Sequence, residues 1–429
     1  MKRVVVTGLG VTSPFGFGVD TFWKSLVAGE NGIRKIDGID PKGKVMGVHA
    51  PLPTIEYTKE RFPELRGQVP EKNEDLAFFA AVQEAVEESG LDFFTYGSTD
   101  RVGVSVSNIL ALDKTHLEDT EPLKKYAVNP DTEDVDLRKV LALCHERELC
   151  KSDPDIEHDH VGHMTNKAYN ITGPHMVTST ACASANNAIG EAFYKIRSSR
   201  LDVVLAGGAF NHNYNGLFGF SRLGALTMNP DPETACSPFD KRRSGFVMGS
   251  GCGVLVMESL EHALQRGAQI LAEVVGYASY GDAYRATDPD PEGKGARYTM
   301  EAAIEVARLH PDQISYINGH GTSTKMNDLI ETKVIKEIFK DRAYDIPVNS
   351  TKSMVGHSVS ACGALEGVAC IKSICDGIVH PTRNWAEQDT DMDLDYVPGA
   401  AREVDVKYAL SNNFGFGGQN ATVIFGKYE

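Results

Sequence analysis

Short apolar runs rich in β-branched residues alternate with longer segments of helical periodicity along most of the chain. Five runs in the first part predict strands: Arg3–Gly10, Arg101–Ser107, His175–Thr180, Asp202–Gly208 and Gly253–Ser259. Five more follow in the second part: Ala272–Ser279, Ser315–Gly321, Ile346–Lys352, Tyr408–Asn413 and Ala421–Gly426. Apolar residues recur at helical spacing in Asp75–Ser89, Thr299–Leu309, Leu329–Phe339 and Ala364–Asp376. This alternation predicts an α/β fold with mainly parallel sheets.

The two parts share one pattern, because each contains five predicted strands and ends in strands with no predicted helix between them. They meet near His262–Gln269, so we expect one half over residues 1–265 and a second over residues 266–429. No short sequence repeat links the halves. The predicted duplication is therefore one of pattern alone.

One segment, Ile109–His163, interrupts this pattern with 14 acidic and 7 basic residues. It contains one predicted helix, Val135–Leu149. A loop of this length without structure of its own is uncommon, so we predict an acidic subdomain inserted into the first half. The segment also gathers possible zinc ligands: Cys144, His145, Cys150, His158, His160 and His163. Their spacing is not a common zinc pattern, and we expect an acidic surface here and no metal site.

The composition narrows the class of protein. The chain has 429 residues, of which 41% are hydrophobic and 24% charged, as in ordinary soluble globular proteins. Its net charge of −16 is unfavourable for binding nucleic acid or an anionic membrane through a broad electrostatic field. We find neither the apolar run of about 18 residues that spans a bilayer nor a signal-peptide layout. Eight cysteines in this length are too few for a disulfide scaffold, so we expect a reducing cytoplasm and mostly buried thiols.

The sharpest local feature is Thr178–Phe193, where a strand runs through small residues into an Ala-rich helix. This pattern places Cys182 at a strand-to-helix elbow, facing the free N–H groups and positive dipole of the helix N-terminus. Such a position is expected to lower the pKa of the thiol and favour the nucleophilic thiolate. The alternative is a buried structural cysteine, and this feature alone does not decide between them.

Two histidines and a lysine follow other predicted strands. His320 lies in NGHGTST, and Lys352 and His357 lie in NSTKSMVGHSVSACGALEG. Functional sites gather at the carboxyl ends of parallel strands, which is where all of these residues are expected. Each taken alone is equally consistent with a hydrogen-bonded polar residue of the core. Together with Cys182 they form a candidate nucleophile and its proton-handling groups.

The Gly-rich segment NNFGFGGQNA, Asn412–Ala421, completes the candidate site. Its glycines, Gly415, Gly417 and Gly418, allow backbone N–H groups to approach a reacting atom closely. An amide from this segment and the amide of Cys182 could form an oxyanion hole. The alternative is a glycine hairpin that only joins the last two strands.

Four motifs, TACASANNAIG, NGHGTST, STKSMVGH and NFGFGGQNA, resemble the active-site blocks of elongating β-ketoacyl–acyl carrier protein synthases. They are also similar to the catalytic (alpha) chains of type II polyketide synthases. The motifs occur in the family's order, and the resemblance covers nearly the whole chain outside Ile109–His163. It implies a thiolase-like fold: two pseudo-repeated βαβαβαββ halves in a five-layer α-β-α-β-α arrangement.

The resemblance also implies roles for individual residues. By position, Cys182 corresponds to the acyl-accepting nucleophile. His320 and His357 correspond to the pair that drives decarboxylation of malonyl and stabilises the resulting enolate. Lys352 corresponds to a lysine beside that pair, and the resemblance pairs it with Glu366.

Further roles follow for the residues around the nucleophile. Phe416, between Gly415 and Gly417, corresponds to the gate residue and the second oxyanion donor. Thr322 and Thr324 correspond to the hydroxyls that bind the phosphopantetheine arm. The substrates travel on that arm of the acyl carrier protein, so the resemblance implies no further cofactor and no metal.

Three departures separate this chain from fatty-acid enzymes of the family. Gln419 stands where many of them have Thr, Pro70–Asp75 is acidic where they tend to be basic, and the acidic insertion is extra. These departures favour the catalytic ketosynthase of a type II polyketide or polyene pathway. The alternative is a housekeeping fatty-acid elongation enzyme that acts as a homodimer.

Two further classes fit less well. A thiolase would carry a second cysteine in the last Gly-rich motif, which has none, and a chain-length-factor subunit would lack the nucleophile that Cys182 supplies. A dimer is implied, with a homologous chain-length factor or with an identical chain, through the predicted edge strand His175–Thr180. Because carrier proteins are acidic, we expect a local basic patch to bind them. The candidates are Arg222, Arg242, Arg243, Lys59, Arg61 and Arg66.

Overall fold

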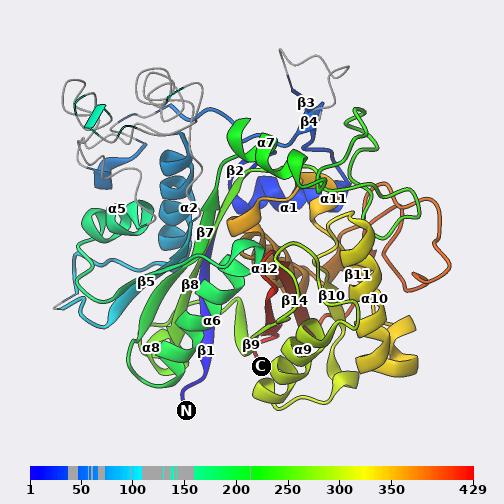
Figure 1. Cartoon of the computed structure of the whole chain (residues 1–429). Coiled ribbons are helices and arrows are strands. Elements are labelled where there is room, and N and C mark those ends of the chain that lie inside the picture. Colours follow the sequence, from blue (N-terminus) through cyan, green and yellow to red (C-terminus); the bar gives the residue numbers. More distant parts are fainter. Residues whose placement is uncertain are drawn as a thin grey trace.

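The computed structural model describes residues 1–36, 47–56, 58, 61–65, 73–96, 98–108, 129, 136, 138–139, 142, 159–212 and 214–429 (Figure 1). Most of the acidic segment Ile109–His163, including most of its predicted helix Val135–Leu149, lies outside these residues. So do Cys144, His145, Cys150 and His158, and the first three residues of Pro70–Asp75.

Five strands of the first half lie side by side in one sheet. They are β1 (Val4–Ser13), β5 (Val102–Ser107), β6 (His175–Thr178), β7 (Val203–Phe210) and β8 (Gly251–Ser259). Their order across the sheet is β6-β5-β7-β8-β1, which is 3-2-4-5-1 when the strands are numbered along the chain. β5 runs parallel to β6 and β7, and β8 runs antiparallel to β7 and β1.

The second half repeats this arrangement strand for strand. Its strands are β9 (Ala272–Gly281), β10 (Tyr316–Asn318), β11 (Val348–Asn349), β14 (Tyr408–Gly415) and β15 (Gln419–Gly426). The order is β11-β10-β14-β15-β9, again 3-2-4-5-1, with β10 parallel to β11 and β14 and with β15 antiparallel to β14 and β9. The duplication predicted from the pattern is therefore present in the topology.

Antiparallel pairing between β1 and β9, from Val4–Val6 to Ala272–Val274, joins the two halves into one continuous sheet. The prediction of mainly parallel sheets is wrong, because the fifth strand of each half runs against its neighbours. In the second half the cause is local. β15 follows β14 through the tight turn at Phe416–Gly418, and strands joined by a short hairpin must be antiparallel.

The described helices are α1 (Val19–Ala28), α2 (Asn73–Ser89), α5 (His160–Ala168), α6 (Ser184–Arg197), α7 (Tyr214–Arg222), α8 (Leu260–Gln265), α9 (Lys294–Ala307), α10 (Lys325–Phe339), α11 (Lys352–Val355) and α12 (Cys362–Asp376). Short strands complete the described elements: β2 (Gly16–Phe17), β3 (Arg34–Lys35), β4 (Val48–His49), β12 (Ile378–Val379) and β13 (Arg402–Glu403). The predicted helices at Thr299 and Leu329 begin earlier, at Lys294 and Lys325, because their polar first turns carry no apolar periodicity. α7 lies between β7 and β8, so the first half does not end in uninterrupted strands.

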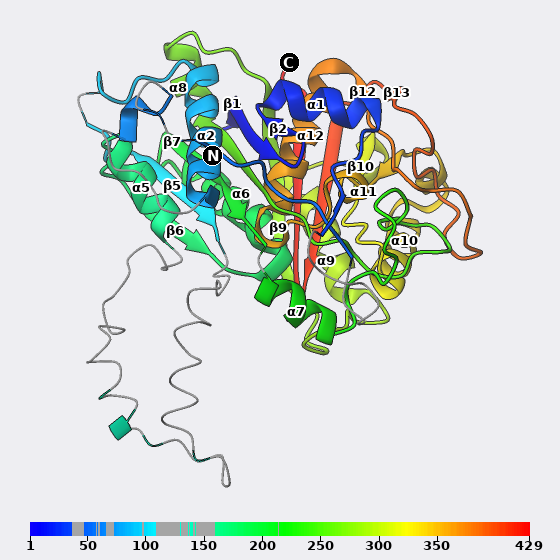
Figure 2. The same cartoon turned by 90° about the horizontal axis from the view of Figure 1, so that it is seen from above.

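The helices form layers around the sheet. α6 and α12 pack against each other and against strands of both halves, and so form a central layer. α2 and α5 cover the outer face of the first half, and α9 and α10 lie on the outer side of the second (Figures 1 and 2). This is the layered, thiolase-like α/β fold that the resemblance implies. None of the described helices is long and apolar enough to cross a membrane.

Glycines in the first strand allow the outer layer to pack closely. A Cβ atom on Gly10 would lie 1.8 Å from the carbonyl oxygen of Ala81 in α2, and one on Gly8 would lie 2.1 Å from the carbonyl oxygen of Ala85. β1 and α2 are thus held backbone to backbone in the core of the first half. β6 leads through the 3-10 turn Ala181–Ala183 into α6, and β11 leads through α11 and the 3-10 turn Val359–Ala361 into α12. The two turns pack against each other.

Candidate active site

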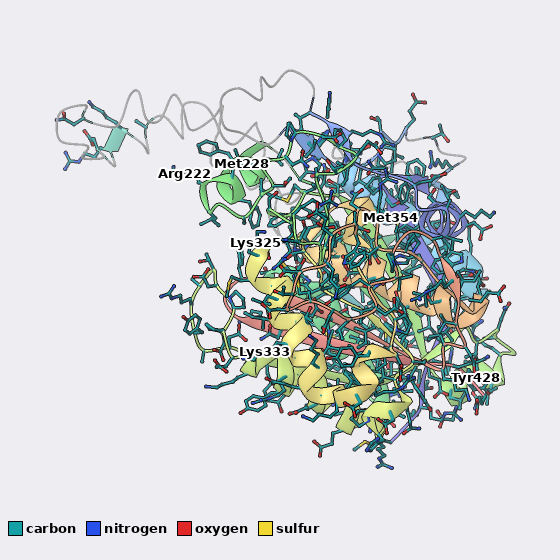
Figure 3. All side chains as sticks on the ribbon, turned by 90° about the vertical axis from the view of Figure 1, so that its right-hand side faces the viewer. Arg222, Met228, Lys325, Lys333, Met354 and Tyr428 are labelled. Carbon is teal, nitrogen blue, oxygen red and sulfur yellow. The ribbon has the colours of Figure 1, made fainter. Side chains whose placement is uncertain are left out.

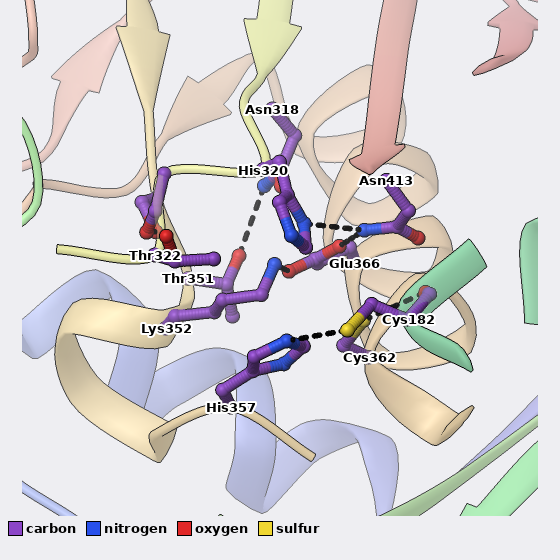
Figure 4. Close-up of polar contacts among 12 residues, drawn as sticks. Cys182, Asn318, His320, Thr322, Thr351, Lys352, His357, Cys362, Glu366 and Asn413 are labelled. Atoms are coloured by element: carbon purple, nitrogen blue, oxygen red, sulfur yellow. Dashed lines mark hydrogen bonds and ion pairs between the residues drawn. The ribbon is translucent and has the colours of Figure 1, made fainter. Parts of the chain in front are cut away.

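Cys182 lies at the elbow between β6 and α6, in the single 3-10 turn Ala181–Ala183. The turn is held from both sides. The Thr180 N–H donates to the Ser184 hydroxyl at 2.7 Å, and that hydroxyl donates to the Ala181 carbonyl at 2.6 Å. Ala181 adopts φ +49°, a left-handed conformation that L residues seldom adopt. The turn directs the Cys182 side chain towards the loops that follow β10 and β11 (Figure 4).

His357 contacts the thiol directly. Its Nε2 lies 3.0 Å from the Cys182 Sγ, and both side chains are buried. The ring of His320 lies 5.3 Å from that of His357, centroid to centroid. One ring nitrogen of each histidine and the cysteine sulfur all lie within 4.8 Å of one another. The structure therefore brings together Cys182, His320 and His357, which the sequence analysis grouped as one candidate site.

Burial controls the charge of these groups. Burial, and then the nearby Lys352 ammonium, hold the pKa of both His320 and His357 well below the usual range, so the imidazoles are neutral. Burial also raises the pKa of Cys182 to about 11, although Lys352 and the N–H groups of Phe416 and Cys182 act to lower it. The expectation of a low thiol pKa is wrong, because desolvation outweighs the helix N-terminus and the cation.

Lys352 and Glu366 form a buried ion pair, and each side chain is 1% exposed. Lys352 begins α11, and Glu366 lies one turn into α12. The side-chain N–H of Asn413 donates to the second carboxylate oxygen of Glu366 at 2.7 Å. Burial alone would lower the pKa of Lys352, but the Glu366 carboxylate outweighs it and raises that pKa. Lys352 is thus a fixed positive charge beside the thiol and the histidines.

Two residues that sequence reasoning missed hold the His320 loop. Glu331, on α10, accepts the backbone N–H of His320 at 2.8 Å and that of Gly321 at 2.9 Å. The side-chain N–H of Asn413 faces Nδ1 of His320 at 3.4 Å. Burial raises the pKa of Glu331 to about 7, against the effect of the two amides. In the sequence, Glu331 stands out as an acidic residue on the apolar face of the predicted helix Leu329–Phe339, and this was the signal that could have identified it.

The Gly-rich segment forms the β14–β15 hairpin and borders the thiol at the same time. Gly417 and Gly418 take the left-handed values φ +81° and φ +71°, which L side chains rarely adopt. A Cβ on Gly415 would lie 3.0 Å from the Cys182 amide nitrogen, so the hairpin passes directly over the elbow. The backbone N–H groups of Phe416 and Cys182 both donate towards the sulfur. The segment is therefore a glycine hairpin, and the same hairpin directs the Phe416 N–H group at the thiol.

A pocket of about 280 Å³ leads to this group of residues. Its inner end is lined by Cys182, His320, His357 and Phe416, and its wall carries Thr322 and Thr324. The two threonine hydroxyls lie 2.9 Å apart. A thiol and two imidazoles are ligand types that zinc accepts, but the Lys352 ammonium gives this site a positive potential that opposes a bound cation.

The comparisons with known proteins agree with this geometry. Residues 1–263 match the family described as "Beta-ketoacyl synthase, N-terminal domain", and residues 271–386 match "Beta-ketoacyl synthase, C-terminal domain". The chain belongs to the β-ketoacyl synthase family. It is therefore an acyl-transferring condensing enzyme.

The relatives of this synthase match it from end to end. It is 38% identical over 429 residues to 3-oxoacyl-[acyl-carrier-protein] synthase 2 of Staphylococcus aureus (strain COL), covering 100% of this chain and 99% of the relative. It is 37% identical over 432 residues to the enzyme of the same name from Synechocystis, with the same coverage.

Two solved structures that cover 100% of both chains have similar folds. The ketosynthase complex AntDE:AntF, a type II polyketide synthase acyl-carrier protein with its ketosynthase, gives a TM-score of 0.84 at 30% identity. The ishigamide ketosynthase/chain length factor gives 0.82 at 32% identity.

The basic residues expected to bind a carrier protein are mostly unsuited to it. Arg243 of the synthase is buried, donating to the Thr324 and Lys325 carbonyls and to Asp389, so its prediction as a docking residue is wrong. Its place in the basic run KRR concealed this burial. Arg242 is held by Asp240.

Of the other candidates, Arg61 lies away from this pocket, two lie outside the described residues, and Arg222 is exposed. Arg61 lies over the ring of Phe17, beside a different groove. Lys59 and Arg66 are not among the residues described. Arg222 is exposed at the end of α7, and Figure 3 shows it on the same side of the molecule as Lys325 and Met228.

Proposed function

We propose that the synthase catalyses a decarboxylative Claisen condensation between an acyl group on Cys182 and a malonyl group carried by acyl carrier protein. The observation that carries this proposal is the convergence of one thiol, two neutral imidazoles and two backbone N–H donors at the inner end of one pocket. The proposed steps use only side chains, backbone amides and the carrier's own arm.

The first step transfers the acyl chain. His357 Nε2, 3.0 Å from the sulfur, accepts the thiol proton as the sulfur attacks the acyl thioester. The high pKa of the resting thiol means that the proton leaves during the attack and not before it. The oxyanion of the tetrahedral intermediate takes the position between the N–H groups of Cys182 and Phe416. Collapse of the intermediate expels the carrier sulfur, which takes a proton from solvent, and leaves the acyl group on Cys182 and the Cys182 proton on His357 Nε2.

The second step uses the two histidines as hydrogen-bond donors to the malonyl thioester oxygen. Asn413 faces Nδ1 of His320 with an N–H group, which leaves the ring proton on Nε2. The carbon–carbon bond to the carboxylate breaks and carbon dioxide leaves. The electron pair of that bond remains on the substrate and forms the enolate. The enolate carbon attacks the acyl group, and the Cys182 thiolate departs and recovers a proton. Loss of one such donor typically costs about 2.7–4 kcal/mol in the transition state.

The pocket fits a slender arm that enters from the surface. Thr322 and Thr324 present their hydroxyls along its wall, where the amides of a phosphopantetheine arm would lie. The mouth carries exposed Leu223 and Met326 beside the basic Lys325. We propose that an acidic carrier protein docks at this mouth, with Lys325 and Arg222 as its charged contacts.

The pathway is a separate proposal with two candidates. The acidic insertion, the acidic Pro70–Asp75 and Gln419 favour a polyketide or polyene ketosynthase that pairs with a homologous chain-length factor. The likeness to AntDE and to the ishigamide complex supports this candidate. Full-length identity of 38% to 3-oxoacyl-[acyl-carrier-protein] synthase 2 supports fatty-acyl elongation by a homodimer. In both candidates the dimer forms through the edge strand β6.

The test uses the purified chain with malonyl carrier protein and a series of acyl carriers. Carbon dioxide release and the mass of the 3-oxoacyl carrier report the condensation. An inactive chain that becomes active when a chain-length factor is co-expressed supports the polyketide candidate. A homodimer that elongates saturated acyl carriers at full rate supports the fatty-acid candidate. A chain that transfers no acyl group to Cys182 in either setting would overturn the condensation itself.

A further inference from the structure

A second cysteine lies directly behind Cys182. Cys362 is the first residue of α12, and its sulfur lies 3.3 Å from the Cys182 carbonyl oxygen (Figure 4). Its side chain is 2% exposed. None of the condensation steps uses this thiol, so the site contains one nucleophilic group that the proposed function leaves without a role.

The two thiols share one cation. Burial raises the pKa of both thiols, that of Cys182 to about 11 and that of Cys362 well above its usual range, and the Lys352 ammonium opposes the rise at each. Cys362 in turn acts to raise the pKa of Lys352, and its effect ranks third after those of burial and Glu366. A positive charge close to both sulfurs stabilises the negative charge that develops on either sulfur as it reacts, which favours thiol–disulfide chemistry.

The surroundings give the two thiols different access to a small oxidant. Cys182 lines the pocket that opens to solvent, and His357 accepts its proton. Cys362 contacts the Cys182 carbonyl and is not among the residues that line this pocket. A hydroperoxide entering the pocket therefore meets Cys182 first, and Cys362 can act only on the product of that reaction.

We propose that Cys182 and Cys362 form a peroxide-sensitive dithiol in which Cys362 resolves the oxidised nucleophile. His357 takes the Cys182 proton as the sulfur attacks hydrogen peroxide; one oxygen passes to the sulfur to give a sulfenic acid, and the other leaves with that proton as water. The Cys362 thiol then attacks the Cys182 sulfur, a sulfur–sulfur bond forms, and the sulfenic hydroxyl leaves with the Cys362 proton as water. A dithiol reductant reverses the second bond and restores the nucleophile.

The backbones at the two thiols are near enough for this reaction. The turn Ala181–Ala183 packs against the turn Val359–Ala361 and against the start of α12. A disulfide requires such close backbone segments. The Cys362 sulfur already contacts the Cys182 main chain, and we expect rotation about the Cα–Cβ bond of Cys362 to bring it to the other sulfur.

The disulfide between Cys182 and Cys362 protects the nucleophile from irreversible oxidation. A sulfenic acid that finds no thiol is oxidised further to sulfinic acid, which ordinary thiols do not reduce. With Cys362 present, oxidised enzyme is held in a recoverable state. The proposal rests on the proposed function only through its activity readout, since the bond itself is detected by mass.

The experiment exposes the full-length chain to a graded excess of hydrogen peroxide, then divides the sample for mass spectrometry and for recovery in dithiothreitol. The native chain should lose about 2 Da and yield a linked peptide pair containing Cys182 and Cys362. Most of its starting activity should return. Cys362→Ser keeps a hydroxyl donor at the Cys182 carbonyl but cannot bridge. It should gain about 32 Da on the Cys182 peptide and recover at least tenfold less activity.

A matched control distinguishes the effect from loss of any buried thiol. Cys370→Ala removes a buried cysteine further along α12 and should behave as the native chain does. The proposal is overturned if the native chain accumulates sulfinic Cys182 as fast as Cys362→Ser, or if its linked peptides exclude this pair. If Cys182→Ala still condenses substrates, the proposed function fails, while the linked-peptide result still decides the dithiol on its own.

Discussion

The ion pair of Lys352 and Glu366 allows a direct test of the claim that Glu366 holds Lys352 as a buried positive charge. Both side chains are 1% exposed. Glu366→Gln preserves the shape of the side chain and an acceptor for the Asn413 N–H, and removes only the negative charge. Lys352 is then a buried cation without its partner. Breaking a buried pair in this way lowers the free energy of unfolding by about 3–5 kcal/mol.

The pH dependence of this loss has a definite sign. In the native chain the raised pKa of Lys352 contributes stability that is fully present below the unfolded-state pKa of about 10.4 and disappears as pH rises through the folded-state value. In Glu366→Gln, burial acts alone and lowers the pKa of Lys352. Raising the pH then neutralises the lysine and relieves the penalty. The difference in unfolding free energy between the two proteins should therefore narrow between pH 7 and pH 10.

The assay is urea unfolding of the two proteins at several pH values. An exposed pair supplies the control. Asp20 and Lys24 on α1 are 82% and 77% exposed, and Asp20→Asn should cost less than about 1 kcal/mol. The double variant Lys352→Met, Glu366→Leu removes both charges and should recover most of the lost stability. A loss below about 1 kcal/mol for Glu366→Gln, or a difference that widens as pH rises, would refute the reasoning.

The other expectations concern the chemistry and the carrier. Cys182→Ala should stop elongation but leave malonyl decarboxylation measurable as carbon dioxide release; continued elongation would remove Cys182 as the nucleophile. His320→Ala should still accept an acyl group, seen by intact mass, and His357→Ala should accept it more slowly because it lacks the base for the Cys182 proton. Both should lose decarboxylation by about 10²–10³-fold; normal decarboxylation in both would exclude the histidines. With a thiol pKa of about 11, alkylation of Cys182 by iodoacetamide should rise with pH through 7 to 10, and a plateau near neutral pH would show that burial does not dominate. Arg222→Glu with Lys325→Glu should weaken carrier binding and its dependence on salt, whereas unchanged binding in a salt titration would place the docking surface elsewhere.

The sequence alone was sufficient to predict that the candidate site residues that follow strands lie close together. His320 follows β10, and Lys352 and His357 follow β11, so their convergence with Cys182 needed only the rule that sites gather at strand ends. Residues whose contribution depends on packing between elements were missed. Glu331 reaches His320 from α10, and Cys362 lies before the predicted helix Ala364–Asp376 and was covered only by the general expectation of buried thiols.

Burial explains the expectations that failed. The motif around Cys182 is polar and rich in small residues, and it gives no indication that the thiol is buried. Arg243 stands in a basic run that is typical of a surface, yet backbone carbonyls and Asp389 surround it in the core. The burial of Cys182 and that of Arg243 both depend on segments more than a hundred residues away, the hairpin at Phe416 for Cys182 and the loop at Asp389 for Arg243.

The two halves allow one inference about how the elbow arose. After the third strand of the second half, β11, the chain makes a 3-10 turn at Val359–Ala361 before α12, as it does at Ala181–Ala183 before α6. Val359 takes φ +35°, and Ala181 takes φ +49°. The counterpart of Cys182 is thus Ser360, which is fully buried and donates its hydroxyl to the Ala209 carbonyl at 2.8 Å. The unusual backbone is present in the half that has no nucleophile, so it was inherited with the fold, and catalysis was added to it by one side chain.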